Sequence, residues 1–164
     1  NGTIDLTLAE EVGEMGGSVE LEIADLEIGD GRAKLAIGDM REGLTIEQID
    51  AGTLTLSANV EEGVLQIDEF SADGPDIELA ADGTVRLANP ISMSRLDLLL
   101  RVKFSDGYRD RNDRTRALFS LMDLTPQLRA AKTSDGALQY RVSGAPGSRI
   151  GTTPAGRAPA PGGD

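Results

Sequence analysis

Apolar and polar residues alternate along most of the first hundred positions of the chain. In residues 18–28, for example, Val19, Leu21 and Ile23 fall on one side of an extended backbone, and Glu20 and Glu22 on the other. A period of two over many short segments predicts an antiparallel sheet with one apolar face. The segments with this pattern are residues 3–8, 18–28, 33–37, 54–60, 65–67, 77–79, 85–87, 94–104 and 137–143.

Turn residues separate these segments. Asp-Gly and Glu-Gly pairs supply the positive φ that tight hairpins require, so a meander of hairpins is predicted. Residues 77–79 and 85–87 are expected to form a hairpin of their own around Asp82-Gly83. The Asp-Gly pairs are at 30–31, 73–74, 82–83, 106–107 and 135–136, and the Glu-Gly pairs at 42–43 and 62–63.

The apolar positions of residues 18–28 shift by one residue part-way along the segment. They run through Val19, Leu21 and Ile23 and continue at Leu26 and Ile28. Because a one-residue slip exchanges the faces of a strand, we expect a bulge or kink near Ala24–Asp25.

Residues 111–132 form the one segment with helical periodicity. Asn112 or Asp113 is expected to cap the start of this helix, and Pro126 to end or bend it. The apolar stripe should pack across the apolar face of the sheet and close one end of it, with Phe119 at the margin. The stripe consists of Leu118, Leu121, Met122 and Leu128.

The pattern divides the chain into residues 1–144, a single β-rich domain, and residues 145–164, a Pro- and Gly-rich tail that we expect to be disordered. Residues 137–143 are the last predicted strand. The chain starts at Asn1 without Met, and it contains no apolar run of about 18 residues. We interpret it as a fragment of a longer protein whose N-terminal anchor is missing.

Composition argues against catalysis. The chain has no His and no Cys, which removes the commonest general base, the thiolate nucleophile and the commonest metal ligands. Asp73, Asp76 and Asp82 lie close together but fit no calcium-loop motif, and no pair of carboxylates stands out as a glycosidase pair. We therefore expect a protein that is not an enzyme and carries no cofactor.

Charge is distributed unevenly. Residues 1–90 carry 21 Asp and Glu against 4 Lys and Arg, and residues 91–164 carry 7 against 12. The acidic half argues against nucleic-acid binding. Polarity of this kind fits either plain solubility or orientation toward a partner. The basic residues of the helical segment fit either a solvated helix side or contact with anionic lipid or acidic protein. These candidate contact residues are Arg109, Arg111, Arg114 and Arg116.

Three pieces of sequence carry a resemblance to a known family. They are the strand pattern of residues 74–87, the motif N-P-I-S-x-S-R-L-D-L at 89–98 with a strand ending in F-S-D at 104–106, and the motif D-G-x-hydrophobic-x-Y-R-V-S-G at 135–144. Together with residues 17–31, their order and spacing resemble the C-terminal half of the type II secretion system protein N family (GspN), over roughly residues 15–150. The chain also resembles AsmA-like proteins.

The resemblance implies a mainly β fold: a curved antiparallel sheet with an apolar concave face and one helix near the C-terminus. It implies a periplasmic domain attached to the bacterial inner membrane through the missing anchor, with no catalytic residues. The first hypothesis is a non-catalytic accessory component of a type II secretion system that binds other secretion proteins. The alternative is an AsmA-like domain that binds or transfers lipid in an apolar groove of the sheet.

Overall fold

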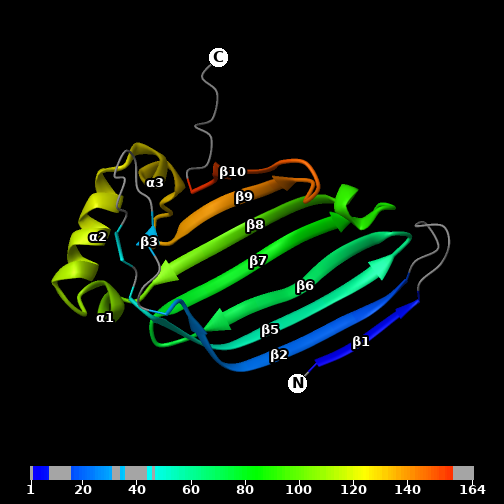
Figure 1. The fold of residues 1–164 in the computed structure, drawn as a ribbon, viewed down its shortest axis with the longest axis horizontal. Helices are drawn as coiled ribbons and strands as arrows, with labels where there is room; N and C mark the ends of the chain where they lie inside the picture. Colours follow the sequence, from blue (N-terminus) through cyan, green and yellow to red (C-terminus); the bar gives the residue numbers. More distant parts are fainter. Residues whose placement is uncertain (1, 8–15, 31–33, 36–43, 46, 157–164) are drawn as a thin grey trace, which may run out of the picture.

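Eight strands form one antiparallel sheet in the computed structural model, which describes residues 2–7, 16–30, 34–35, 44–45 and 47–156. Spatial neighbours follow chain order, except that β5 pairs directly with β2 and leaves β3 and β4 as a separate pair (Figure 1). The fold is therefore mainly β, as predicted. The strands of the large sheet are β1 (Gly2–Thr7), β2 (Gly16–Ile28), β5 (Ile49–Glu61), β6 (Val64–Asp73), β7 (Ile77–Arg86), β8 (Arg95–Phe104), β9 (Leu138–Gly144) and β10 (Ile150–Pro154). The small pair is β3 (Lys34–Leu35) and β4 (Leu44–Thr45).

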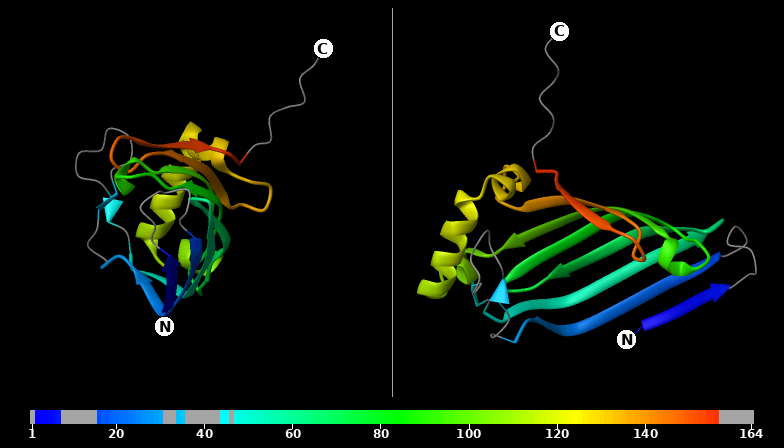
Figure 2. Two further views of the ribbon diagram at one scale, coloured as in Figure 1. Left: turned by 90° about the vertical axis from the view of Figure 1, so that its right-hand side faces the viewer. Right: turned by 45° about the horizontal axis from the view of Figure 1, so that its top comes forward.

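The sheet curls about its long axis into a trough. Figure 2 shows the strands arching around an interior, with the helices at one end and the other end open. Within the described chain, β1 and β10 are the two edges, and each pairs with one strand only. The sheet is therefore an open trough, and we call the helical end the closed end.

The strand register gathers the apolar positions on the inner face of the trough. Directly paired residues of antiparallel strands project to the same side of a sheet. Leu98 lies between Gly83 and Val142, whereas the next residue, Leu99, lies between Asp82 and Arg141 on the outer face. The large inner residues of the strands from β2 to β9 are Val19, Leu21, Ile23, Leu54, Leu56, Val60, Leu65, Ile67, Phe70, Leu79, Val85, Leu96, Leu98, Leu100, Val102, Leu138, Tyr140 and Val142.

The predicted bulge in β2 is confirmed. The register with β5 shifts between Ile23 and Leu26, and Asp25 has a φ of 53°. Glu62-Gly63 forms the tight turn between β5 and β6, with φ values of 49° and 74°. Asp73 ends β6 and Gly74 follows it, and the pair at 135–136 falls in a connection. Gly31 and the pair at 42–43 lie outside the described residues, as do Leu8, Ala33 and Ile37 of predicted strands.

The predicted hairpin around Asp82-Gly83 is wrong, because residues 77–86 form the single strand β7. Gly83 is needed there for close packing instead of a turn. Its φ is 133°, and a β-carbon on it would lie 2.2 Å from the carbonyl oxygen of Asp97 on β8. The Asp106-Gly107 pair is likewise no hairpin turn, since it begins a helix.

Two helices, α2 (Asp113–Leu124) and α3 (Pro126–Ala131), replace the single helix predicted for residues 111–132. A further short helix, α1 (Asp106–Arg109), precedes them. Asn112 caps α2, because its side chain accepts hydrogen bonds from the backbone N–H groups of Arg114 and Thr115. Pro126 stands at the first position of α3, which confirms that it interrupts the helical segment.

Part of the segment predicted as a disordered tail is regular. Residues 150–154 form β10, which pairs with β9 from Ile150–Gly144 to Pro154–Tyr140, so residues 137–143 are not the last strand. The backbone N–H of Ala155 then donates to the carbonyl oxygen of Gln139 at 2.8 Å. Residues 157–164 lie outside the described residues.

Candidate functional site

A compact core fills the closed end of the trough. Tyr108 of α1 and Phe119 of α2 pack against Phe104 at the end of β8, with ring centroids 5.1 to 6.1 Å apart. The inner-face residues that they contact include Ala72, Leu79 and Val102. The helices therefore seal this end with aromatic side chains, in a chain that is otherwise poor in them.

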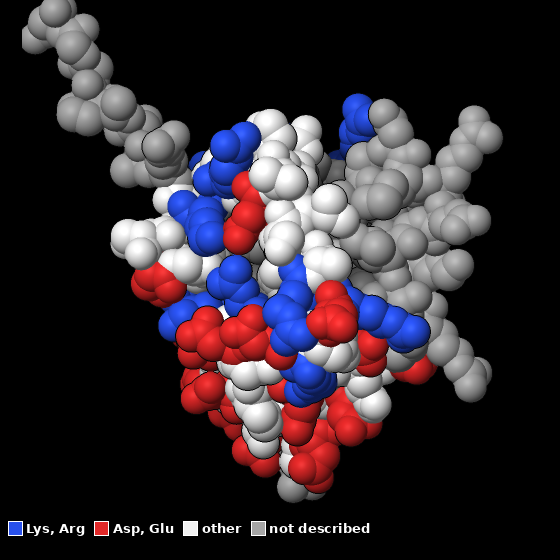
Figure 3. All heavy atoms as spheres, turned by 90° about the vertical axis from the view of Figure 1, so that its left-hand side faces the viewer, with Lys and Arg blue, Asp and Glu red and all other residues white. Residues whose placement is uncertain are grey.

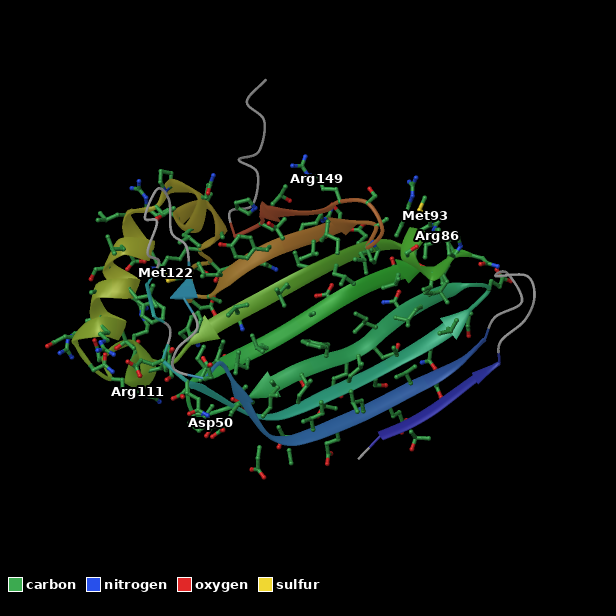
Figure 4. The ribbon with its side chains drawn as sticks, viewed as in Figure 1. Asp50, Arg86, Met93, Arg111, Met122 and Arg149 are labelled. Carbon is green, nitrogen blue, oxygen red and sulfur yellow. The ribbon has the colours of Figure 1, made fainter. Side chains whose placement is uncertain are left out.

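Phe119 is central to this core, so its predicted position at the margin of the helix stripe is wrong. Leu118 is also buried, at 5% exposure, and Met122 packs against the core from the next turn of α2. Leu124, at the end of α2, is 71% exposed. A cavity of about 30 Å³ remains between Met122, Phe119 and the β8 residues Val102 and Phe104 (Met122 is labelled in Figure 4).

Asp76 connects four segments at the closed end. Its side chain, 6% exposed, accepts a hydrogen bond from the backbone N–H of Asp50 at 2.8 Å and is paired with the guanidinium of Arg111. Its own carbonyl oxygen accepts from the N–H of Ser105 at 2.9 Å. The start of β5 and the α1–α2 connection therefore meet at the Asp76 carboxylate, and the end of β8 is held by the backbone carbonyl of the same residue.

The inner face beyond this core is only partly covered. Large aliphatic residues of the inner face are half-buried along β2, β5, β6, β8 and β9, and Ile23 is exposed. The outer face of the same strands carries polar and charged residues such as Glu20, Thr55 and Asp97. The trough is thus lined by aliphatic side chains that retain contact with solvent.

The four arginines singled out in the sequence all lie at the closed end, on the outside of α1 and α2. Figure 3 shows this end, with basic side chains across its middle and upper part and acidic ones below. Each of the four has an acidic neighbour: Arg109 is 3.5 Å from Asp123, Arg114 is 3.7 Å from Glu47, Arg111 pairs with Asp76, and Arg116 pairs with Asp113.

Two of these arginines serve the fold. The guanidinium of Arg111 lies 4.9 Å from the ring centre of Tyr108 and donates to the carbonyl oxygen of Gln48 at 3.1 Å, so its contacts are with the fold itself (Arg111 is labelled in Figure 4). Arg109 lies 5.1 Å from the ring centre of Phe119. Arg114, whose side chain is 76% exposed, is the most accessible of the four.

A second group of arginines, which sequence reasoning missed, lies at the other end of the sheet. Arg86 ends β7 and is directly opposite Arg95, which begins β8. Together with Arg141 and Arg149 they line an open hollow of about 630 Å³ on the outer face. The signal was available in the sequence, since strands flanking the 87–94 connection must pair antiparallel and bring the two arginines together.

Other features of the described residues are few. No group of three or more His, Cys, Asp or Glu side chains within the described ranges is arranged to hold a metal ion, and Asp73 and Asp82 are exposed strand residues. Across the same ranges, no helix has the length and apolar character to cross a membrane. Burial raises the pKa of the Tyr108 hydroxyl, which donates to the carbonyl oxygen of Glu47 at 2.9 Å.

Comparison with known proteins gives no match: no family model, no curated protein and no solved structure corresponds to this chain.

Proposed function

We propose that the domain binds the acyl chain of a lipid on the inner face of the trough and performs no chemistry on it. The observation that carries this proposal is the partly covered inner face. An apolar surface that stays accessible to solvent along several adjacent strands is costly in a soluble domain and commonly marks a binding site.

The dimensions of the trough suit a long flexible ligand. β2 and β5 each contain 13 residues, so the inner face is about 40 Å long at the usual rise per residue. The aromatic core of Phe104, Tyr108 and Phe119 gives this surface one closed end. The side chains between that core and the open end are mainly Leu, Ile and Val, which offer an acyl chain contacts without hydrogen-bonding demands.

Two adjacent residues of β8 provide a matched test. Leu98 projects to the inner face and Leu99 to the outer face, and both are half-buried. The protein is purified without detergent, examined by native mass spectrometry for co-purified lipid, and titrated with a fluorescent fatty acid. Leu98→Gln should weaken fatty-acid binding about tenfold or more by placing an amide in the apolar path, and Leu99→Gln should leave binding unchanged.

Binding that is absent in the wild-type protein, both as co-purified lipid and as titrated fatty acid, would overturn the proposal. So would equal weakening by the two variants while both remain folded, because the inner-face position would then have no special effect on binding. Thermal unfolding of each variant, measured alongside, shows whether it is folded.

We further propose, as a second candidate, that the domain binds other proteins of a type II secretion system. The sequence resemblance favours it, because its three pieces, residues 74–87, 89–106 and 135–144, fall on the adjacent strands β7, β8 and β9 and the segments that flank them. Affinity capture of the domain against the periplasmic parts of such a system tests this candidate. Failure to retain any of them, together with normal export in a deletion strain, would rule it out.

A further inference from the structure

The end of the sheet opposite the helices has a defined tip made of two connections. The first is residues 87–94, which contain the short 3₁₀ helix η2 (Ile91–Met93), and the second is the β9–β10 connection, residues 145–149. The backbone N–H of Gly147 donates to the carbonyl oxygen of Ser92 at 2.6 Å, and a β-carbon on Gly147 would lie 2.8 Å from that oxygen. The two connections, called the distal tip below, are therefore held together.

The distal tip exposes large apolar side chains. Ile91 is 65% exposed and Met93 54% exposed, and η2 contributes no buried residue. Ile150, directly after the second connection, is also exposed. Ser94 holds the two ends of the first connection together, because its buried hydroxyl accepts a hydrogen bond from the backbone N–H of Ala88 at 3.1 Å. Ile91 and Met93 thus project from an ordered segment.

Arginines without acidic partners flank these apolar residues. Arg86 and Arg95 are paired across the strands, an arrangement that like charges disfavour. Among the described residues, no carboxylate lies within ion-pairing distance of Arg86, Arg95 or Arg149, whereas Arg141 of the same hollow is 3.6 Å from Asp97. Figure 4 labels Arg86 and Met93 toward this end of the sheet and Arg149 on the β9–β10 hairpin.

Most basic residues elsewhere in the described part of the chain have an acidic partner. The chain has an excess of 12 negative charges, and the arginines and lysines at positions 101, 103, 109, 111, 114, 116 and 132 each lie near a carboxylate. Arg129 of α3 also has no ion pair among the described residues, but it lies at the closed end. In such an acidic protein, three arginines without ion pairs at the end that also exposes Ile91 and Met93 form a local surface of opposite character.

We infer that the distal tip docks on the surface of an anionic lipid bilayer, with Ile91 and Met93 in the interface and Arg86, Arg95 and Arg149 on lipid phosphates. Exposed apolar residues beside basic ones are the combination that binds such surfaces, where both terms contribute. The inference does not depend on acyl-chain binding in the trough. It would, however, direct the open end of the trough toward the membrane.

The acidic remainder of the domain does not oppose this contact strongly. At physiological salt, charges more than about 8 Å away are largely screened. Asp97, which lines the same hollow, is paired with Arg141. Glu61 and Glu62 are also close, because the carbonyl oxygen of the next residue, Gly63, accepts from the N–H of Leu87 in the first connection of the tip. The anionic membrane surface should repel these two glutamates and tilt the domain, so that the side with β7 to β10 approaches the membrane.

Vesicle flotation with the full chain tests the inference. The vesicles are phosphatidylcholine alone and phosphatidylcholine with phosphatidylglycerol. The test variants are the triple Arg86→Gln, Arg95→Gln, Arg149→Gln and the double Ile91→Ser, Met93→Ser. The matched control removes three positive charges from the closed end by Arg114→Gln, Arg116→Gln and Arg129→Gln.

The wild-type protein should float with anionic vesicles and not with neutral ones. The tip triple should bind roughly 100-fold more weakly, since each basic residue near an anionic surface contributes about fivefold. The apolar double should also bind more weakly, and the closed-end control should bind as the wild type does. Soluble glycerol phosphate at the same phosphate concentration should not release the protein.

Three results would overturn the inference: no flotation of the wild-type protein with anionic vesicles, unchanged flotation of both tip variants, or equal losses in the tip and closed-end triples. Release by glycerol phosphate would show a site for free phosphate in place of a membrane-docking surface. Fatty-acid titration of the same variants distinguishes this inference from trough binding, because the tip substitutions leave the inner face intact.

Discussion

The carboxylate of Asp76 and the guanidinium of Arg111 form an ion pair that ties the turn before β7 to the connection between α1 and α2. Asp76 is almost completely buried, and Arg111 also stacks on the ring of Tyr108. One side chain thus joins the sheet, the helical end and the aromatic core. Arg111 is therefore a structural residue, although the sequence suggested it as a contact for a partner.

Arg111→Ala should lower the free energy of unfolding by about 1.5–3 kcal/mol, because it leaves a buried carboxylate without its charged hydrogen-bond donor. Arg114→Ala, on the exposed side of the same helical end, should change it by no more than about 0.5 kcal/mol. Urea denaturation of the two variants measures the difference. Equal effects would show that the Asp76–Arg111 pair contributes nothing specific.

Leu118→Ala should cost about 2–5 kcal/mol, since it opens a cavity where α2 meets the core. Leu124→Ala is the control on the same helix, and because Leu124 is exposed its effect should stay within about 0.5 kcal/mol. The same denaturant melts check both values. A silent Leu118→Ala would mean that α2 is not docked on the closed end.

Gly83→Ala should destabilise the fold by about 1–3 kcal/mol, because a φ of 133° is essentially restricted to glycine and the added methyl would meet the backbone of β8. Gly136→Ala separates the two causes. Gly136 also has a positive φ, of 85°, but nothing lies within 4 Å of its β-carbon position. Thermal unfolding should rank Gly83→Ala as the more harmful, and the reverse order would contradict the close packing of β7 on β8.

The two tyrosines of the chain should ionise at a higher pH in the folded protein than in the unfolded one. Burial raises the pKa of Tyr108 and of Tyr140 above the ordinary value of 10.0. Because a raised pKa means that the folded state holds the proton more tightly, the resulting stability is complete below about pH 10 and is lost as the pH rises through the folded pKa values.

Ultraviolet titration of tyrosinate, with and without denaturant, measures this shift. The native curve should lie at higher pH, and Tyr108→Phe should remove half of its amplitude. Superimposable native and denatured curves, with the protein still folded by circular dichroism, would contradict the burial of both rings.

Alternation in the sequence was sufficient to predict the sheet, its apolar face and the bulge at Asp25, because these follow from local periodicity. Asp82-Gly83 misled because the same dipeptide serves a turn and a close approach between strands, and only the register with Asp97 distinguishes them. β10 was missed because Gly151, Thr152 and Thr153 carry no apolar alternation. Pairing with β9, which a local pattern does not reveal, places these residues in the sheet.

The closed end was predicted in outline only. A continuous helix over residues 111–132 would leave Phe119 beside the stripe, but the breaks at residues 110–112 and at Thr125 separate the segment into short helices. Phe119 packs against Phe104 and Tyr108. Because these residues belong to other segments, the helical periodicity of residues 111–132 does not predict the contact. The tip arginines Arg86 and Arg95 are nine positions apart and become neighbours through strand pairing. They were missed because the two predicted strands on either side of residues 87–94 were not paired with each other.

The order of the strands has a consequence for how the protein folds and opens. From β5 to β8 each strand pairs with the next strand of the chain after a short connection, and so do β9 and β10, so these pairings close small loops and the sheet can grow by successive addition. The β8–β9 pairing closes the longer connection of residues 105–137, which contains the helices. The loop of residues 29–48 between β2 and β5 is the costliest closure in the β1–β5 part. Hydrogen exchange should therefore be slowest in β6, β7 and β8 and faster toward the two edges. The edge strands would then unpair first, while the central strands stay paired.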